Sequence, residues 1–190
     1  MERKIIFATK NEGKLSEIKK IINCISMTSA NIDIDVVEDG ESYIENAFKK
    51  ARAICKISNM ETLADDSGVE IAHLNGLPGK DAAIYLTDNT KYKERNAKIL
   101  EMMKDAKDRS AKYVCHIVYV SPDGKELHTT ASIKGKIAEK SEGTNGFAYD
   151  DIFIPDAFPD RTMAQLSLEE KISISHRTIA LEKMKELLGL

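Results

Sequence analysis

The order of hydrophobic patterns along this 190-residue chain predicts an α/β fold in which a mixed β-sheet is flanked by helices. Strand-like and helix-like segments alternate from the first residues onward. In the middle of the chain, the apolar run "AKYVCHIVYV" is followed by the turn sequence "SPDG" and a second strand pattern, which indicates a long hairpin. The length suits a single domain over residues 1–190 that buries a sizeable core.

The first elements are a strand over residues 1–8 and a helix that carries Leu15, Ile18 and Ile22 on one side. Lys14 falls in the first turn of this helix, where the helix dipole disfavours a positive charge. Either the lysine extends into water, or it neutralises an anion that binds the exposed helix amides. The stretch "FATKNEGKLSEI" leaves both open, because Gly-Lys after a strand is a weak pattern and the first glycine of a Walker A loop is missing.

A second helix begins at Ser42, which is predicted to form a capping box with Glu45. Its apolar residues form one stripe, at Ile44, Ala47, Phe48, Ala51, Ile54 and Cys55. Lys50 lies about 40° from the edge of this stripe. From there its ammonium group reaches either a cleft beside the core or the solvent.

The acidic sequence "DDSG" separates two predicted short strands, over residues 62–64 and 69–74. Adjacent residues of a strand point to opposite faces, so Asp65 and Asp66 converge only if the chain turns between the two strands. Converging carboxylates would suit a hard divalent ion such as Mg²⁺, with Glu38 as a further candidate ligand. The alternatives are that the two aspartates only close a hairpin and that Glu38 is a solvated loop residue.

The remaining elements continue the alternation of helices and strands. A helix that begins near Thr90 is followed by the central hairpin, whose second strand covers residues 126–138. Ser167 and Glu170 predict a second capping box. The C-terminal helix, with Gly189 as its C-cap, carries its apolar residues on one side, at Ile179, Ala180, Leu181, Met184, Leu187 and Leu188.

The start of the C-terminal helix raises the same question as Lys14. In "ISHRTIAL", Ser175 is a favourable N-cap, and His176 and Arg177 place two potential cations in the first turn. Two helix starts with positive groups suggest that the protein binds a ligand with anionic or carbonyl groups. Phe147, in "GFAYD", is either part of the core or a face on which a flat base stacks.

The composition is that of an ordinary globular protein, with 42% hydrophobic residues, 31% charged residues and a net charge of −3. This charge argues against a protein that binds nucleic acid or a membrane surface by overall electrostatics. Cys24, Cys55 and Cys115 lie far apart, which indicates buried thiols in a reducing compartment. Because no apolar run is long enough to span a membrane and no signal peptide precedes the first strand, we expect a soluble, cytoplasmic protein.

Six sequence blocks occur in the order found in one enzyme family: "FATKNEGKLSEI", "ENAFKKAR", "LADDSGVEI", "LNGLPG", "GFAYDDIFIP" and "EEKISISHRTIAL". Over nearly its whole length the chain resembles the Ham1-like inosine triphosphate pyrophosphatase family, the XTP/dITP diphosphatases. The resemblance implies an elongated, twisted mixed sheet in two lobes with a central substrate cleft, and a homodimer. It also implies Mg²⁺-dependent hydrolysis of noncanonical purine nucleoside triphosphates (ITP, dITP and XTP) to the monophosphate and pyrophosphate.

The resemblance also implies roles for individual residues. Those that would contact the triphosphate are Thr9, Lys10, Asn11, Glu12, Gly13, Lys14 and Lys50. Those that would bind the metal are Asp66, Glu38 and Asp65, and Asp66 would also accept a proton. Those that would contact the rest of the substrate are Ser67, Phe147, Ala148, Tyr149, Asp150 and Lys171, with His176 and Arg177 as readers of the purine 6-oxo group.

The chain departs from the family pattern at a few positions. Ile84 stands where bacterial members often have arginine, although Lys80 is close in sequence; Ala148 replaces a more usual glycine and Asp151 a proline. Two other functions remain open at this point. One is a house-cleaning pyrophosphatase for other modified nucleotides, and the other is a non-catalytic nucleotide sensor in which Asp65 and Asp66 only turn the chain. Which carboxylate is the base and which the metal ligand is also open.

Overall fold

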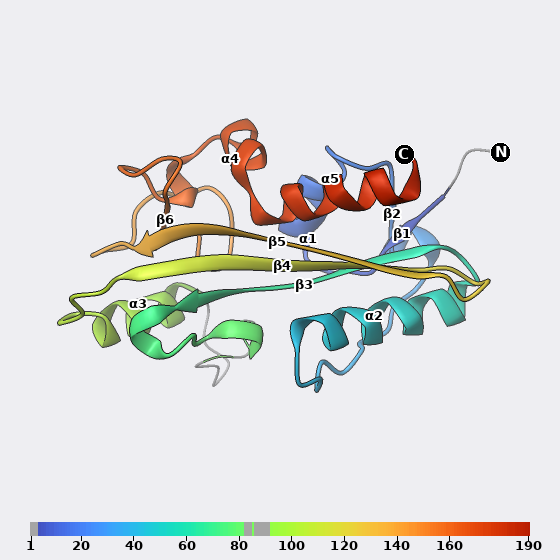
Figure 1. Ribbon diagram of the computed structural model, residues 1–190, viewed down its shortest axis with the longest axis horizontal. Coiled ribbons are helices and arrows are strands. Elements are labelled where there is room, and N and C mark those ends of the chain that lie inside the picture. The colour runs from blue at the N-terminus through green and yellow to red at the C-terminus, as the bar shows by residue number, and fades with distance from the viewer. Residues whose placement is uncertain (1–3, 82–84, 86–91) are drawn as a thin grey trace. The chain divides into compact units, whose positions relative to one another are not determined.

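The computed structural model describes residues 4–81, 85 and 92–190. Within them, six strands form one sheet in the order β2-β1-β3-β4-β5-β6 (Figure 1). The strands are β1 (Ile6–Phe7), β2 (Ile25–Ser26), β3 (Thr62–Ile71), β4 (Ser110–Val120), β5 (Glu126–Ile137) and β6 (Phe153–Pro155). β1 pairs in parallel with β2 and β3, whereas β5 and β6 are antiparallel, so the sheet is mixed as predicted.

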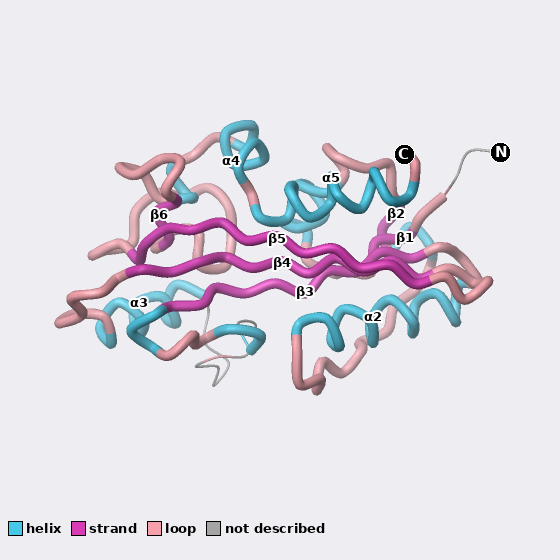
Figure 2. Tube along the Cα trace, in the orientation of Figure 1, coloured by secondary structure: helices cyan, strands magenta, loops and turns pink. Residues whose placement is uncertain are grey.

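Five α-helices accompany the sheet in the described part of the chain (Figure 2). They are α1 (Glu12–Ile18), α2 (Tyr43–Ser58), α3 (Tyr92–Met102), α4 (Leu168–Ile174) and α5 (His176–Leu188). The α/β class is therefore confirmed. The predicted start of α3 at Thr90 and the departure at Ile84 both lie outside the described residues.

The chain divides into two compact units. The first unit comprises Met1–Asp66, Cys115–Ala131 and Arg177–Leu190, and the second unit comprises Ser67–Val114 and Ser132–His176. The strands β3, β4 and β5 contribute residues to both units. The single domain over 1–190 and the substrate cleft implied by the family resemblance stay predictions.

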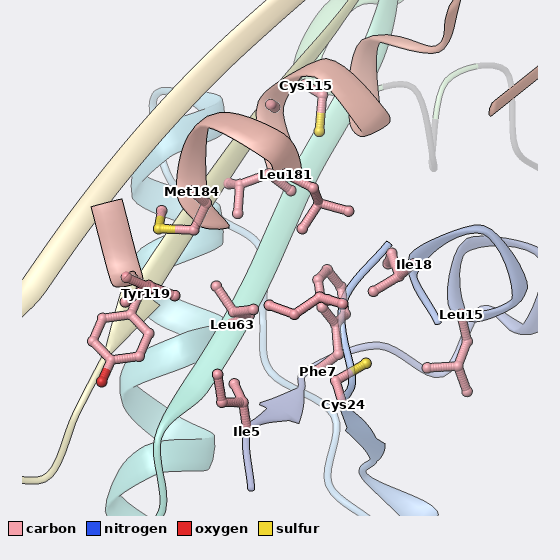
Figure 3. Packing of buried hydrophobic residues seen from close by; sticks show 14 of the residues in the cluster. Ile5, Phe7, Leu15, Ile18, Cys24, Leu63, Cys115, Tyr119, Leu181 and Met184 are labelled. Atoms are coloured by element: carbon pink, nitrogen blue, oxygen red, sulfur yellow. The ribbon is translucent and has the colours of Figure 1, made fainter. Parts of the chain in front are cut away.

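In the first unit, alternate strand residues enter two separate hydrophobic clusters. Phe7 and Leu63 (Figure 3), together with Ile117, pack with residues of α1 and α5, whereas Ile6 and Ala64 pack with residues of α2. Figure 1 shows α1 and α5 on one face of these strands and α2 on the other. Because side chains alternate along a strand, neighbouring residues of β3 face different helices.

The second unit has its own hydrophobic cluster, to which each of its strand and helix segments contributes. Its buried members include Val69, Ile99, Tyr113, Ile137, Tyr149 and Phe153. This cluster supports the segment of residues 147–152 that precedes β6. The C-terminal part of that segment is anchored by hydrogen bonds from Ala138 N to the Ile152 carbonyl and from Ala164 N to the Asp150 carbonyl.

The predicted turn between two short strands at "DDSG" is wrong, because β3 is one continuous strand of ten residues from Thr62 to Ile71. Residues 72–74 form a 3₁₀ turn instead of the predicted end of the second strand. The composition of Asp-Asp-Ser-Gly is typical of a turn, but here the two aspartates are buried in a strand that has neighbours on both sides. Their charges are met by cations from helices, which local sequence does not reveal.

The two predicted capping boxes have different outcomes. At α4, Ser167 accepts a hydrogen bond from Glu170 N, and the Glu170 carboxylate accepts one from Ser167 N, so this box is complete. At α2, Ser42 accepts a hydrogen bond from Glu45 N, but the Glu45 carboxylate accepts its bond from Glu41 N. The start of α2 is confirmed, and the reciprocal half of its box is not.

The predicted apolar side of α5 is only partly buried. Ala180, Leu181 and Met184 are fully buried, whereas Ile179 and Leu187 are 37% and 52% exposed. Neighbouring helix residues are separated by about 100°, so a stripe that contains the consecutive residues 179–181 is wider than the face that the helix presents to the core. The predicted C-cap is confirmed, since Gly189 has a φ of +66°.

All three cysteines are free and buried, as predicted. Burial raises the pKa of the Cys115 thiol to about 12, so this side chain acts as a small hydrophobic residue of the core. None of the helices in the described ranges combines the length and the apolar character that crossing a membrane requires.

Gly135→Ala should destabilise the β5–β6 pair. Gly135 lies opposite Pro155, and a methyl group there would overlap the Ile154 carbonyl oxygen and the Phe153 ring. We expect the free energy of unfolding to fall by about 1–3 kcal/mol, as for an overpacked core. Denaturant unfolding would measure it, with the exposed neighbour Lys134→Ala as control; equal midpoints for both variants would contradict the expectation.

Candidate functional site

Asp65 is the centre of a buried ion cluster in the first unit. Its carboxylate lies 2.8 Å and 3.0 Å from Lys14 Nζ and 3.3 Å from Arg177 Nε. Arg177 also donates to Glu17 Oε2 at 2.6 Å, and the side chains of Asp65, Glu17 and Arg177 are each at most 3% exposed. Two buried carboxylates thus face two cations, which is the condition under which buried charges are tolerated.

The cluster keeps Asp65 ionised. Burial on its own would raise the pKa of Asp65, but the charges of Lys14, Arg177 and Lys50 outweigh it and hold the pKa well below its usual range. Burial likewise opposes the charge of Arg177, and the carboxylates of Asp65 and Glu17 outweigh it, so the pKa of Arg177 is raised. The surrounding cations therefore favour the ionised form of Asp65.

Lys14 is positioned by the polar loop that precedes α1. Asn11 is the N-cap of α1, and its Oδ1 accepts a hydrogen bond from Lys14 N at 3.0 Å. Thr9 Oγ1 in turn accepts one from Asn11 N at 3.1 Å. The alternative that Lys14 extends into water is wrong, because its side chain is 16% exposed and pairs with Asp65. The lysine does meet an anion, and that anion belongs to the protein.

Asp66 belongs to the opposite face of β3, the face covered by α2. The strand alternation that sends Leu63 toward α5 and Ala64 toward α2 also separates Asp65 from Asp66. On the α2 side, Lys50 Nζ lies 3.2 Å from Glu38 Oε1, and the Lys50 side chain is only 13% exposed. Lys50 therefore points inward from the edge of the helix stripe, and the solvent alternative for it is wrong.

Asp66 has a very different charge environment from Asp65. Burial raises the pKa of Asp66 to about 6; Lys50 and Lys14 oppose this increase, and Glu38 and Asp65 add to it. Burial would lower the pKa of Lys50, but Asp65, Asp66 and Glu38 outweigh that effect and raise it. A carboxylate whose pKa lies near 6 is well suited to accept a proton at neutral pH.

The same acids are the candidates for a metal site. Among the residues that the structure describes, no three His, Cys, Asp or Glu side chains come together as a protein-only metal cage. Mg²⁺ is usually held by one or two carboxylates together with substrate phosphates, and Asp66 and Glu38, which share Lys50 as a neighbour, suit that arrangement. Asp65 is held by Lys14 and Arg177 on the other face, which argues against its predicted role as a third ligand.

A second polar group lies in the second unit around Asp150. Asp150 Oδ2 accepts hydrogen bonds from Lys171 Nζ at 2.6 Å and from Phe147 N at 2.8 Å, and Oδ1 accepts one from the Tyr113 hydroxyl at 3.3 Å. Gly146 has a φ of +78°, and a side chain there would overlap the Asp150 carboxylate. Asp150 therefore fixes the turn that carries the predicted base-side residues.

The predicted base-side residues differ in their surroundings. Phe147 is half-buried, and Lys171 Nζ lies 4.5 Å from the centre of its ring. Tyr149 is a core residue, and burial raises its pKa to about 12. Ala148 has a φ of +56°, a left-handed conformation that explains why glycine would be more usual there; Asn96 Nδ2 donates to its carbonyl at 2.8 Å.

His176 and Arg177 are neighbours in sequence but belong to different groups. His176 is buried and stacks on the Tyr113 ring, with centroids 4.6 Å apart and planes within 8°. Arg177 belongs to the cluster of Asp65 and Glu17. The two side chains therefore have different partners. That both of them bind the 6-oxo group of the purine stays a prediction.

Several predicted contacts lie at the surface or have other partners. Lys10 lies 2.8 Å from Asp33 and 2.9 Å from Asp35, and Glu12 is exposed in the first turn of α1. Gly13 and Ser67 are half-buried. Lys80, which we considered in connection with Ile84, pairs with Asp81 at 2.7 Å.

Two residues of these groups were missed by the sequence analysis. Glu17 lies one position before the buried Ile18, and a charged residue beside an apolar stripe is a signal that could have indicated a buried ion pair. Tyr113 lies in an apolar strand pattern, where a tyrosine is indistinguishable from an ordinary core residue.

An α/β sheet that buries two adjacent acids, one paired with Lys14 and the other near Lys50, has the charge pattern suited to phosphate groups and a divalent ion. A model of the Ham1 family matches residues 5–187, and the chain belongs to this family. The dITP/XTP pyrophosphatase of Clostridium perfringens is 40% identical, covering 97% of this chain and 96% of the relative. That of Staphylococcus aureus strain MRSA252 is 38% identical, covering 98% and 97%.

Solved structures of the family have the same fold. The Ham1 protein of Staphylococcus aureus superimposes with a TM-score of 0.87 at 37% identity, covering 98% of each chain. A HAM1 protein of Coxiella burnetii gives a TM-score of 0.88 at 36% identity, covering 99% of each chain. The family resemblance and the fold class read from the sequence are thereby confirmed. Pyrophosphatases of this family generally use a divalent metal.

The raised pKa of Asp66 predicts a specific pH dependence of stability. A carboxyl with a pKa of about 6 in the folded chain and about 3.9 in the unfolded chain favours folding while it is protonated, so its contribution is lost as the pH rises from about 4 through 6. Asp66→Asn mimics the protonated form at every pH. In EDTA, the variant should be as stable as the parent at pH 4 and about 2–3 kcal/mol more stable at pH 8.

Urea unfolding of both proteins across this pH range measures the difference. Asp39→Asn changes an exposed loop acid paired with Lys49 and serves as the control. A stability difference between Asp66→Asn and the parent that stays constant from pH 4 to pH 8 would show that Asp66 has an ordinary pKa.

Proposed function

We propose that this chain is a Mg²⁺-dependent nucleoside triphosphate pyrophosphatase that hydrolyses the noncanonical purine nucleotides ITP, dITP and XTP to the monophosphate and pyrophosphate. Support comes from relatives named dITP/XTP pyrophosphatases, which cover nearly the whole chain. The observation that carries the proposal is the division of the two buried aspartates of β3. Asp65 is neutralised by Lys14 and Arg177, and Asp66 retains a proton-accepting carboxyl beside Lys50 and Glu38.

Lys14 and Lys50 are the proposed phosphate-binding cations. Both are largely buried, and each is already paired with a carboxylate, Lys14 with Asp65 and Lys50 with Glu38. A triphosphate presents stronger acceptors in greater number, so each lysine can hold a phosphate oxygen while its carboxylate keeps the ammonium group in place. The loop of Thr9 and Asn11, whose shape is fixed by its own hydrogen bonds, would bring further amides to the phosphates.

Asp66 and Glu38 are the residues proposed to hold Mg²⁺ together with the substrate. When bound, the ion supplies charge neutralisation to the triphosphate oxygens. Asp66 orients the water that attacks the α-phosphorus and takes its proton as the bond to the bridging oxygen breaks and pyrophosphate leaves. Before the ion binds, the pKa of about 6 leaves the Asp66 carboxylate ionised at neutral pH, which suits both of the roles proposed for it.

The proposed base-side contacts are Phe147, Lys171 and His176 of the second unit and Arg177 of the first unit. Phe147 offers a half-buried ring for stacking, and Lys171 is fixed by Asp150 beside it. His176 and Arg177 are proposed donors to the purine O6, an acceptor in inosine and xanthosine that adenosine replaces with an amino donor. Guanine also carries O6, so these donors separate ITP from ATP and leave the exclusion of GTP to contacts near the 2-position.

We also propose that the chain acts as a homodimer and works in the cytoplasm, where it would remove these nucleotides from the precursor pool. The family resemblance supports the dimer, and light scattering on the purified protein would test it. The two rival functions predict different products, since a sensor leaves the nucleotide intact and a pyrophosphatase for other nucleotides spares ITP.

A nucleotide panel with Mg²⁺ should release pyrophosphate from ITP, dITP and XTP. Asp66→Asn should reduce kcat for ITP by a factor on the order of 10² or more, as expected when a positioned acid-base group is removed. Asp39→Asn, which changes an exposed acid of the loop that contains Glu38, should keep parental activity. Release of orthophosphate alone, or full activity of Asp66→Asn, would contradict the proposed reaction or the role of Asp66.

Arg177→Ala should narrow the ratio of kcat/KM for ITP over that for ATP, since guanidinium groups only donate hydrogen bonds and an adenine amino group cannot accept one. Loss of one such hydrogen bond is expected to change the ratio of kcat/KM for ITP over ATP by about fivefold to a hundredfold. Urea unfolding must accompany the assay, because the variant leaves Glu17 and Asp65 with fewer cations. If kcat/KM falls by the same factor for ITP and for ATP, Arg177 does not select the base, and its role is limited to the ion cluster with Asp65 and Glu17.

A further inference from the structure

Tyr113 of β4 contacts both His176 and Asp150, two of the residues proposed to lie on the base side of the substrate. Its ring stacks face to face on the imidazole of His176, with centroids 4.6 Å apart and planes within 8°. Its hydroxyl donates to Asp150 Oδ1 at 3.3 Å. Its ring also meets the Phe153 ring edge-on, with the two centroids 4.6 Å apart.

These contacts are more specific than filling the core requires. Phenylalanine would occupy the same space against Phe153, but it would remove a donor from the buried carboxylate of Asp150. A leucine would keep an apolar contact in a smaller volume but would not define the plane of an adjacent imidazole. Because ring nitrogens bond only near the plane of the imidazole, a parallel stacking partner fixes the directions in which His176 can donate.

The two contacts act on different parts of the same group. Asp150 also accepts from Phe147 N and Lys171 Nζ, so the Tyr113 hydroxyl is one of the donors that set the position of its carboxylate. That carboxylate determines where the Phe147 ring and the Lys171 ammonium group lie. Tyr113 thus holds the orientation of His176 with its ring and contributes to the turn of residues 147–150 with its hydroxyl.

We propose that Tyr113 is a positioning residue for base selection, which orients the His176 imidazole and the Asp150 carboxylate toward the purine without being required for phosphate hydrolysis. The inference rests on the proposed function in one respect, that His176 and the Asp150 turn face the base. It adds a specificity-determining side chain from a strand that contains none of the residues assigned to the substrate.

Two variants separate the contributions of the ring and the hydroxyl. Tyr113→Phe keeps the stacking and loses the hydroxyl, and should lower the ratio of kcat/KM for ITP over ATP about threefold. Tyr113→Leu loses both and should lower the ratio about tenfold, with kcat for saturating ITP reduced much less. Tyr119→Phe is the matched control, because Tyr119 is a buried tyrosine of the same strand whose hydroxyl donates to Glu61 at 2.7 Å.

Nuclear magnetic resonance of the ligand-free protein gives a readout independent of turnover. The ring protons of His176, assigned with His176→Gln, should be shifted upfield by the Tyr113 ring in the parent and in Tyr113→Phe. They should move toward ordinary positions in Tyr113→Leu. Unchanged His176 signals in Tyr113→Leu would overturn the stacking role.

The base preference decides between a positioning role and a merely structural one. If Tyr113→Leu lowers the melting temperature but leaves the ITP-to-ATP ratio within twofold of the parent, the proposal is wrong. If Tyr113→Leu does not fold, the threefold effect of Tyr113→Phe against no effect of Tyr119→Phe carries the test. A parent that does not cleave ITP contradicts the proposed function instead, and the ratio of affinities for inosine and adenosine monophosphate, measured by calorimetry, then decides the role of Tyr113.

Discussion

The burial of two adjacent carboxylates in the middle of β3 is the constraint on which the first unit depends. Asp65 and Asp66 are 1% and 5% exposed, and an unpaired buried carboxylate costs several kcal/mol. Because the strand continues through them, the two acids face different layers and must be stabilised separately. One is neutralised by cations, and the other has a pKa of about 6. Environments that push two pKa values apart in this way are typical of sites that divide ligand binding from proton transfer.

Three helices supply the cations that make this burial possible. α1 contributes Lys14 and α5 contributes Arg177, each in a first turn where the helix dipole disfavours a positive charge, and α2 contributes Lys50. The unfavourable local positions of Lys14 and Arg177 are outweighed by the buried carboxylate that both contact. Violations of local preference of this kind are expected at functional sites, where tertiary contacts determine the residue.

The sequence predicted most helices and strands, because their apolar residues recur with helical or strand periodicity. It failed at β3, where Asp-Asp-Ser-Gly has the composition of a turn and the partners that keep it extended are remote. Lys14 is 51 positions from Asp65, and Arg177 is 160 positions from Glu17. Local patterns carry no information about such pairs. The family resemblance named Lys14, Asp66 and Arg177, but it did not indicate that Asp65 and Glu17 hold two of these side chains in place.

The second unit also contains residues that the family resemblance names and supporting residues that it does not name. Two residues that the resemblance assigns to the substrate contact side chains that it does not mention: the Ala148 carbonyl accepts a hydrogen bond from Asn96, and the His176 ring stacks on Tyr113. Such supporting residues are tyrosines, asparagines and acids that sequence patterns place in the core or on a helix face. They contribute by orienting the residues that contact the substrate, and this orientation exists only after the chain has folded. A site of this kind can therefore be recognised from its contact residues, but its selectivity depends on side chains that only the structure identifies.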